Sequence, residues 1–179
     1  MAIIGLFYGS DTGNTEVIVQ KIIDQFGKSM LVEHDMANIR TIDVFSRYDH
    51  IIIGVPTWYD GDLQSDWDLF LEKFKTIDFS GKQVAIFGLG DQIGYGEYFV
   101  DGIGILGKVV LENNGEIVGA CSTDGYDFEA SEALFEHEDA SYFMGLPLDE
   151  DNESELTDSR LLPWLKRIVE EFNSVAEHA

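Results

Sequence analysis

The N-terminal segment combines a strand, a polar turn and a helix in an order that limits the possible folds. Residues 3–8 form an apolar run, residues 9–15 are mostly small and polar, and residues 16–26 show a helical pattern of apolar side chains. A turn between a strand and a helix presents backbone N–H groups at the helix N-terminus, where they can hold an anion. The sequence therefore predicts an α/β unit with a phosphate-binding turn.

The side chains of this turn narrow the kind of phosphate site. Because the turn has neither Lys nor Arg, it does not match the GxxxxGK[ST] loop of nucleotide hydrolases. The spacing of Gly9 and Gly13 also differs from the GxGxxG fingerprint of dinucleotide-binding folds. An alternative interpretation is that Ser10 and Thr12 only cap the helix. The neutral donors available to a phosphate are Ser10, Thr12, Asn14 and Thr15.

The charge of the chain restricts its partners. With 34 acidic and 11 basic residues, the formal net charge is −23. Nucleic acids and anionic membrane surfaces would be repelled by this charge. Basic protein partners would instead be attracted, with association rates that depend on salt. We therefore expect no nucleic-acid and no membrane partner.

The sequence also favours a cytoplasmic location. It has no apolar window of about 18 or more residues, which a membrane-spanning helix needs. The first residues lead directly into the predicted strand, without the basic start of a signal peptide. Cys121 is the single cysteine and cannot form an internal disulfide, as is usual in a reducing compartment. We expect a monomer.

Strands and helices alternate along most of the chain. This alternation predicts a doubly wound parallel α/β sheet of five strands with helices on both faces and right-handed crossovers. We expect residues 1–179 to form a single domain. The predicted strands are 3–8, 30–33, 51–55 (ending at Pro56), 83–88 and 117–121, and the predicted helices are 16–26, 42–45, 65–74, 98–113 and 158–174, the last with Thr157 as its N-cap.

The alternation breaks after Cys121. About 35 residues follow without a clear helical pattern, which is longer than an ordinary connection. Within them, residues 142–148 are apolar enough to form a strand. We interpret this part as an edge strand interrupted by a long inserted loop at residues 123–141.

Three polar loops follow the carboxyl ends of predicted strands, at residues 9–15, 56–62 and 88–96. In open α/β sheets, ligands bind outside these ends, at the point where the strand order reverses. The first loop can hold a phosphate, and the other two each offer an aromatic ring, Trp58 and Tyr95. This combination predicts a site for a flat, phosphorylated ring system.

At these loops the chain resembles the flavodoxins. Ser10-Asp11-Thr12-Gly13-Asn14-Thr15, Pro56-Thr57-Trp58-Tyr59-Asp60-Gly61 and Gly88-Leu89-Gly90-Asp91-Gln92-Ile93-Gly94-Tyr95 are similar, in order and spacing, to the three FMN-binding loops of that family. The segment from Gly145 to Asp151 is similar to the long-chain subgroup.

The resemblance implies a low-potential one-electron carrier that binds FMN non-covalently. Residues 10–15 would bind the FMN phosphate, with Trp58 on the inner face of the flavin and Tyr95 on the outer face. The peptide between Tyr59 and Asp60 would turn toward flavin N5 on reduction. The implied cofactor-binding residues are Ser10, Asp11, Thr12, Gly13, Asn14, Thr15, Pro56, Thr57, Trp58, Tyr59, Asp60, Gly61, Gly90, Asp91, Gln92, Tyr95 and Asp151.

The family also implies partners, and two other functions are weighed against it. The partners would be a flavodoxin/ferredoxin–NADP reductase and electron-accepting enzymes, which would dock on an acidic face. One alternative is an FMN-dependent, quinone-reductase-like enzyme, although no basic residue near the three loops could hold a nicotinamide phosphate. A phospho-receiver domain would need an acidic pair where the chain has Gly9 and Ser10. We expect no catalytic residue and no metal ligand.

Overall fold

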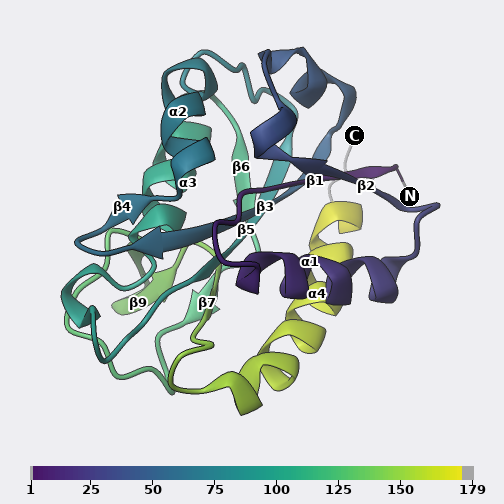
Figure 1. Ribbon diagram of the computed structural model, residues 1–179. Helices are drawn as coiled ribbons and strands as arrows, with labels where there is room; N and C mark the ends of the chain where they lie inside the picture. Colours follow the sequence, from purple (N-terminus) through teal and green to yellow (C-terminus); the bar gives the residue numbers. More distant parts are fainter. Residues whose placement is uncertain (1, 175–179) are drawn as a thin grey trace.

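The computed structural model describes residues 2–174 and places a mostly parallel sheet at the centre of the molecule (Figure 1). Neighbouring strands lie in the order β10-β5-β3-β1-β2, which is the doubly wound arrangement that the sequence predicts. The prediction of a parallel α/β fold is confirmed. The strands on this path are β1 (Ile4–Tyr8), β2 (Leu31–Asp35), β3 (His50–Trp58), β5 (Gln83–Leu89) and β10 (Leu146–Leu148).

Two pairs of helices enclose the sheet. α1 (Asn14–Phe26) and α4 (Thr157–Ser174) lie together on one face, and α2 (Ser65–Phe74) and α3 (Asp101–Glu112) lie on the other (Figure 1). β3 contributes side chains to the hydrophobic cores on both faces of the sheet, because successive side chains of a strand point to opposite faces. Ile51 and Ile53 pack toward α2 and α3, whereas Ile52 packs toward α1 and α4. Short 3-10 helices occupy Met36–Asn38, Ile42–Arg47, Gly96–Tyr98 and Ser154–Leu156.

β3 is longer than predicted. The sequence places its end at Pro56, but the strand continues to Trp58 and pairs there with the antiparallel β4 (Asp62–Leu63). β1 ends opposite Gly54, so that Pro56 has a strand neighbour only on the β5 side. A proline is tolerated where a strand lacks one neighbour, because its missing N–H then breaks no ladder bond.

Two separate strands pair with β5 on the side opposite β3. β6 (Glu116–Val118) pairs with the first part of β5, and β10 pairs with its last part. The predicted strand at 117–121 ends early because Gly119 adopts φ 77°. The predicted strand at 142–148 divides at Gly145, where a side chain would come within 2.0 Å of the Ile86 carbonyl oxygen.

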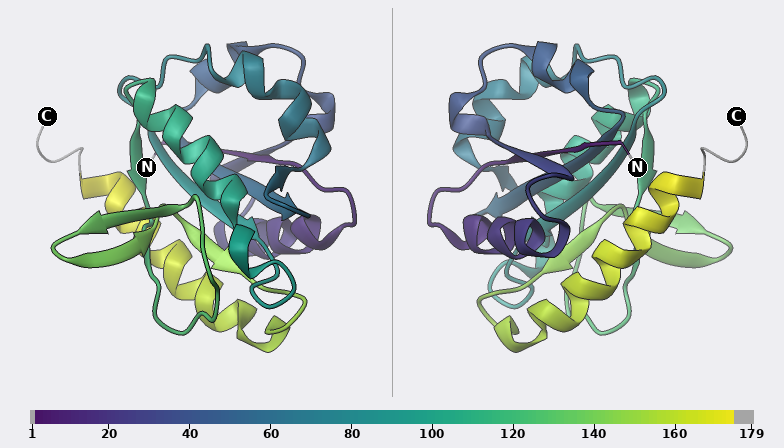
Figure 2. Two further views of the ribbon diagram at one scale, coloured as in Figure 1. Left: turned by 90° about the vertical axis from the view of Figure 1, so that its left-hand side faces the viewer. Right: turned by 90° about the vertical axis from the view of Figure 1, so that its right-hand side faces the viewer.

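The segment predicted as a loop at 123–141 is also different. It contains β8 (Leu134–His137) and the start of β9 (Ala140–Phe143). Together with β7 (Cys121–Ser122) these strands form an antiparallel sheet in the order β7-β9-β8. Figure 2 shows the hairpin of β8 and β9 projecting from the body of the molecule beside α4.

Three helix starts differ from the sequence prediction. α1, predicted from residue 16, begins at Asn14. The helix predicted from residue 98 begins at Asp101, because Val100 adopts a left-handed conformation with φ 50° that no α-helix continues. Thr157, predicted as an N-cap, is the first residue of α4 itself. On α4, Leu162 is exposed, whereas Trp164 is buried in the core.

None of the helices within residues 2–174 is long and apolar enough to cross a membrane. The domain predicted for residues 1–179 includes residue 1 and residues 175–179, which lie outside the described part of the chain.

Candidate functional site

A cleft lies at the carboxyl ends of β1, β3 and β5, where the sequence places the site. It brings together thirteen of the predicted residues and three that were not predicted, namely Leu89, Tyr98 and Glu150. Gly13, Asp60, Gly61 and Gln92 do not line it. The predicted residues that line the cleft are Ser10, Asp11, Thr12, Asn14, Thr15, Pro56, Thr57, Trp58, Tyr59, Gly90, Asp91, Tyr95 and Asp151.

The first turn leaves the start of α1 open to an anion. Gly13 precedes the helix with φ 90°, and its N–H donates to Ser10 Oγ at 3.0 Å. Among the residues that the structure describes, no side chain accepts a hydrogen bond from the first turn of α1. The alternative interpretation that Ser10 and Thr12 cap this helix is therefore wrong. The first-turn N–H groups and the positive end of the helix dipole suit a phosphate group.

The second loop is a hairpin turn between β3 and β4. It needs left-handed backbone at two positions, Tyr59 with φ 43° and Gly61 with φ 90°. Tyr59 is 65% exposed, and its ring packs edge-on against Tyr95 with centroids 6.5 Å apart. Trp58 Nε1 is buried and has no hydrogen-bond partner within residues 2–174. A buried N–H without an acceptor is costly, so this one leaves a donor unused in a residue that lines the cleft.

The third loop folds around the side chain of Asp91. Asp91 Oδ1 accepts hydrogen bonds from the N–H groups of Ile93 at 3.0 Å and Gly94 at 2.6 Å. Burial alone would raise the pKa of Asp91, but these bonds and one from Asn152 outweigh it and lower the pKa. The carboxylate therefore stays charged beside the cleft, and Tyr95 is held at the rim.

Gln92 differs most from its predicted position. Its side chain is 3% exposed and is directed away from the cleft, toward Asp149. Its backbone N–H also donates to Asp149, at 3.1 Å. Sequence reasoning missed this because Asp149 lies 57 residues further along the chain.

The cleft is strongly acidic. Among residues 2–174, its lining contains four carboxylates and neither Lys nor Arg. Burial, followed by the charges of Asp91, Asp149 and Glu150, raises the pKa of Asp151. The site therefore disfavours further negative charge, apart from a group held directly by the turn before α1. The four carboxylates belong to Asp11, Asp91, Glu150 and Asp151.

Comparisons with known proteins agree with this geometry. A family model described as flavodoxin matches residues 6–164. The chain belongs to the flavodoxin family. It is 47% identical over 169 residues to a flavodoxin of Nostoc sp., covering 94% of this chain and 96% of that protein. It is 46% identical over 173 residues to flavodoxin 1 of Escherichia coli K12, covering 97% and 96%.

A solved structure supports the same assignment. The flavodoxin of Fusobacterium nucleatum bound to flavin mononucleotide superimposes with a TM-score of 0.88 at 34% sequence identity, covering 96% of this chain and 99% of that one. The predictions of a flavodoxin, of FMN as its cofactor and of electron transfer are confirmed. As a flavodoxin, the protein is an electron-transfer flavoprotein and not an enzyme, and it exchanges electrons with redox partners.

The residues of the cleft fit FMN. The open start of α1 suits its phosphate, the aromatic rings suit its flat ring system, and Trp58 Nε1 lacks the acceptor that a phosphorylated ligand carries. The quinone-reductase-like alternative is not favoured, because no Lys or Arg in the described part of the chain lines the cleft.

Proposed function

We propose that this flavodoxin holds FMN in the acidic cleft and exchanges single electrons with a flavodoxin/ferredoxin–NADP reductase and with electron-accepting enzymes. The observation that carries this proposal is the convergence of the uncapped start of α1, Trp58 and Tyr95 on one cleft. When bound, FMN supplies the one-electron chemistry, and the protein sets its potential and its exposure.

We assign the cofactor contacts by loop. The first-turn N–H groups of α1 and the neutral side chains of residues 10–15 hold the phosphate, and Gly13 allows the turn that aims them. Trp58 and Tyr95 cover the two faces of the flavin ring and exclude water. Asp151 contacts the ribityl chain.

Backbone groups complete the site in this proposal. Residues 57–61 and 90–95 line the edge of the flavin, and the peptide between Tyr59 and Asp60 turns toward N5. The left-handed φ of Tyr59 supports this assignment, because strained backbone of this kind is found at switch regions, and Gly61 adopts its positive φ without strain. Gln92 belongs to the third loop, but its side chain supports the loop from the side that faces away from the cleft.

The carboxylates of the cleft lower the reduction potential. One carboxylate about 10 Å from the ring, at an effective dielectric constant near 20, opposes a negative charge by about 1.7 kcal/mol. This energy equals roughly 70 mV for a one-electron couple before screening by salt. Because Asp11, Asp91, Glu150 and Asp151 all line the cleft, we expect a strongly reducing couple.

The same acidic face is proposed to dock the partners. With a net charge of −23, the protein would attract a basic reductase and would repel a second copy of itself, which supports a monomer. Small, salt-sensitive interfaces are typical of redox encounters. The free thiol of Cys121 supports a cytoplasmic location, and the continuous sheet supports one FMN-binding domain over residues 1–179.

Titration with FMN followed by reductase assays tests the proposal. The apoprotein should bind FMN, and reductase turnover should slow as ionic strength rises to about 0.5 M, because exposed charges are then screened. Failure to bind FMN would exclude the site, and a turnover independent of salt would exclude acidic docking. Mixing the holoprotein with NADPH alone should leave the flavin oxidised, whereas direct bleaching would indicate an enzyme.

A further inference from the structure

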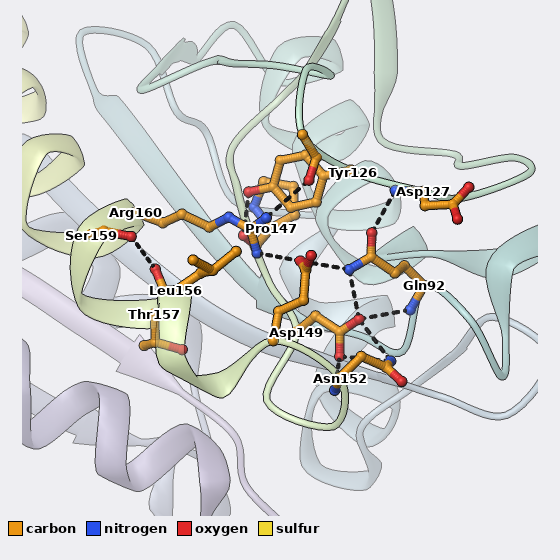
Figure 3. Close-up of polar contacts among 12 residues, drawn as sticks. Gln92, Tyr126, Asp127, Pro147, Asp149, Asn152, Leu156, Thr157, Ser159 and Arg160 are labelled. Carbon is orange, nitrogen blue, oxygen red and sulfur yellow. Dashed lines mark hydrogen bonds and ion pairs between the residues drawn. The ribbon is translucent and has the colours of Figure 1, made fainter.

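Gln92 lies behind the cofactor cleft, at the centre of a buried polar network (Figure 3). Its Nε2 donates to Asp149 Oδ2 at 2.9 Å and to Glu153 Oε2 at 2.7 Å. Its Oε1 accepts from the backbone N–H of Asp127 at 2.6 Å. Every polar atom of this side chain therefore has a partner, and each partner comes from a segment distant in the sequence.

Asp149 is the second centre of the network and is 1% exposed. Its Oδ2 faces the backbone and side-chain N–H groups of Gln92, and its Oδ1 accepts from the backbone N–H groups of Asp151 at 3.2 Å and Asn152 at 3.0 Å. A buried carboxylate with this many donors is a strong and directional tie. It fixes the spacing between the third loop and the segment that carries Asp151.

A second connection joins the same two segments at the edge of the cleft. Asn152 Nδ2 donates to Asp91 Oδ1 at 2.8 Å and also to both oxygens of Asp149. Because Asp91 and Asp151 both line the cleft, a shift of Asp149 would move cleft residues from both segments.

The network extends to α4 and to the segment between β6 and β10. Glu153 pairs with Arg160 of α4 at 2.8 Å, and the Arg160 guanidinium lies 4.2 Å from the ring centroid of Tyr126. The Tyr126 hydroxyl donates to the Pro147 carbonyl at 2.7 Å, directly before β10 ends. The segment that carries Tyr126 and Asp127 is therefore connected to the cleft by hydrogen bonds through Gln92 and Asp149.

We infer that Gln92 and Asp149 are positioning residues that set FMN affinity without contacting the cofactor, and that the segment between β6 and β10 acts on the site through them. This inference rests on the proposed FMN site. It reassigns Gln92 from a cofactor contact to a support behind the third loop.

The test compares Gln92→Met with Gln83→Met in the full chain. Both glutamines are buried and lie at or just beyond opposite ends of β5. Within the described residues, the side chain of Gln83 donates to Glu116 and to the Glu171 carbonyl, away from the cleft. Both substitutions should lower the melting temperature of the apoprotein. The FMN dissociation constant should rise at least about tenfold for Gln92→Met and less than about twofold for Gln83→Met, because only the first loses the tie between the cleft segments.

A second variant changes Asp149, the other centre of the network. In Asp149→Asn, either orientation of the amide directs an NH₂ group toward N–H donors, so FMN affinity should fall and amide exchange at residues 91–95 should accelerate in the apoprotein. FMN affinity within about twofold of wild type in both Gln92→Met and Asp149→Asn, with lowered melting temperatures, would show a merely structural role and overturn the inference. Failure of the wild type to bind FMN would instead contradict the proposed function.

Discussion

The Asp101 carboxylate lies against the backbone of Gly61, so that a Cβ at Gly61 would come within 2.7 Å of Asp101 Oδ2. Asp101 begins α3, and Gly61 closes the hairpin turn beside the cleft. The turn that carries Trp58 and Tyr59 is therefore supported from below by a buried carboxylate.

Gly61→Ala should destabilise the apoprotein through two effects. A left-handed alanine costs about 1–2 kcal/mol, and the contact with Asp101 adds about 1–3 kcal/mol of overpacking. Gly125→Ala is the matched control, because Gly125 has φ 84° but nothing within 4 Å of an added Cβ. Urea unfolding should give the larger loss for Gly61→Ala. Equal losses for the two variants would show that the contact with Asp101 is unimportant.

Asp101→Asn should change how stability depends on pH. Burial raises the pKa of Asp101, with the Glu132 N–H and Lys108 opposing this and the Glu132 charge adding to it. In the folded state Asp101 therefore holds its proton to a higher pH than in the unfolded chain, so wild-type stability falls as pH rises from the unfolded pKa of about 3.9 through the folded pKa. Asn can still accept the Glu132 N–H bond, made at 2.8 Å.

The measurement is the free energy of unfolding of both apoproteins between about pH 3 and 7. The free energy of unfolding of the Asn variant minus that of the wild type should increase as pH rises above about 4, and should then level off. A difference that stays constant with pH would mean that Asp101 has the same pKa in both states.

The parts of the fold that could be predicted depend on local chemistry. The helix at 65–74 was predicted with its observed bounds, because its apolar spacing lies within one segment. The start of α3 was not, because the left-handed Val100 is held by tertiary packing at 0% exposure. The sequence also did not predict that two short strands, β6 and β10, share the edge of β5. They are distant in the sequence and are brought together by their pairing with β5.

The site shows the same limit. Cleft residues on the loops could be located because the carboxyl ends of parallel strands meet at one edge. The direction of the Gln92 side chain could not, because it depends on partners at Asp127, Asp149 and Glu153.

Trp58→Phe should weaken FMN binding. It should lower the stability of the apoprotein less than Trp67→Phe does. Trp58 Nε1 has no partner within the described residues, so removing it breaks no bond of the apoprotein. Trp67 is the control, because it is fully buried and its Nε1 donates to the Gly54 carbonyl at 3.0 Å.

We expect the FMN dissociation constant to rise about tenfold for Trp58→Phe, as for a lost bond to a charged group. Trp67→Phe should instead lower apoprotein stability by about 2–3 kcal/mol through the lost bond and the cavity. Fluorescence titration and urea unfolding measure the two effects. Unchanged FMN affinity in Trp58→Phe would show that the cofactor does not use this N–H.

Gly104→Ala should destabilise the protein even though alanine favours helices. A Cβ at Gly104, inside α3, would come within 2.1 Å of the Glu132 carbonyl oxygen, so α3 and the segment before β8 could no longer pack closely. The usual helical gain of about 1 kcal/mol would be outweighed by an overpacking cost of about 1–3 kcal/mol or more. Gly107→Ala, one turn later in α3, meets mainly the flexible Met144 sulfur at 3.1 Å and should be neutral or stabilising.

Urea unfolding of both apoproteins, together with amide exchange at residues 131–134, distinguishes the two alanines. Only Gly104→Ala should accelerate exchange there, because only its new methyl group displaces the backbone of Glu132. Since the displaced segment also carries the Glu132 N–H that binds Asp101, the strained turn at Gly61 should loosen as well. Equal stability of the two variants would mean that α3 can move away from this segment at little cost, and the close packing at Gly104 would then not hold the segment in place.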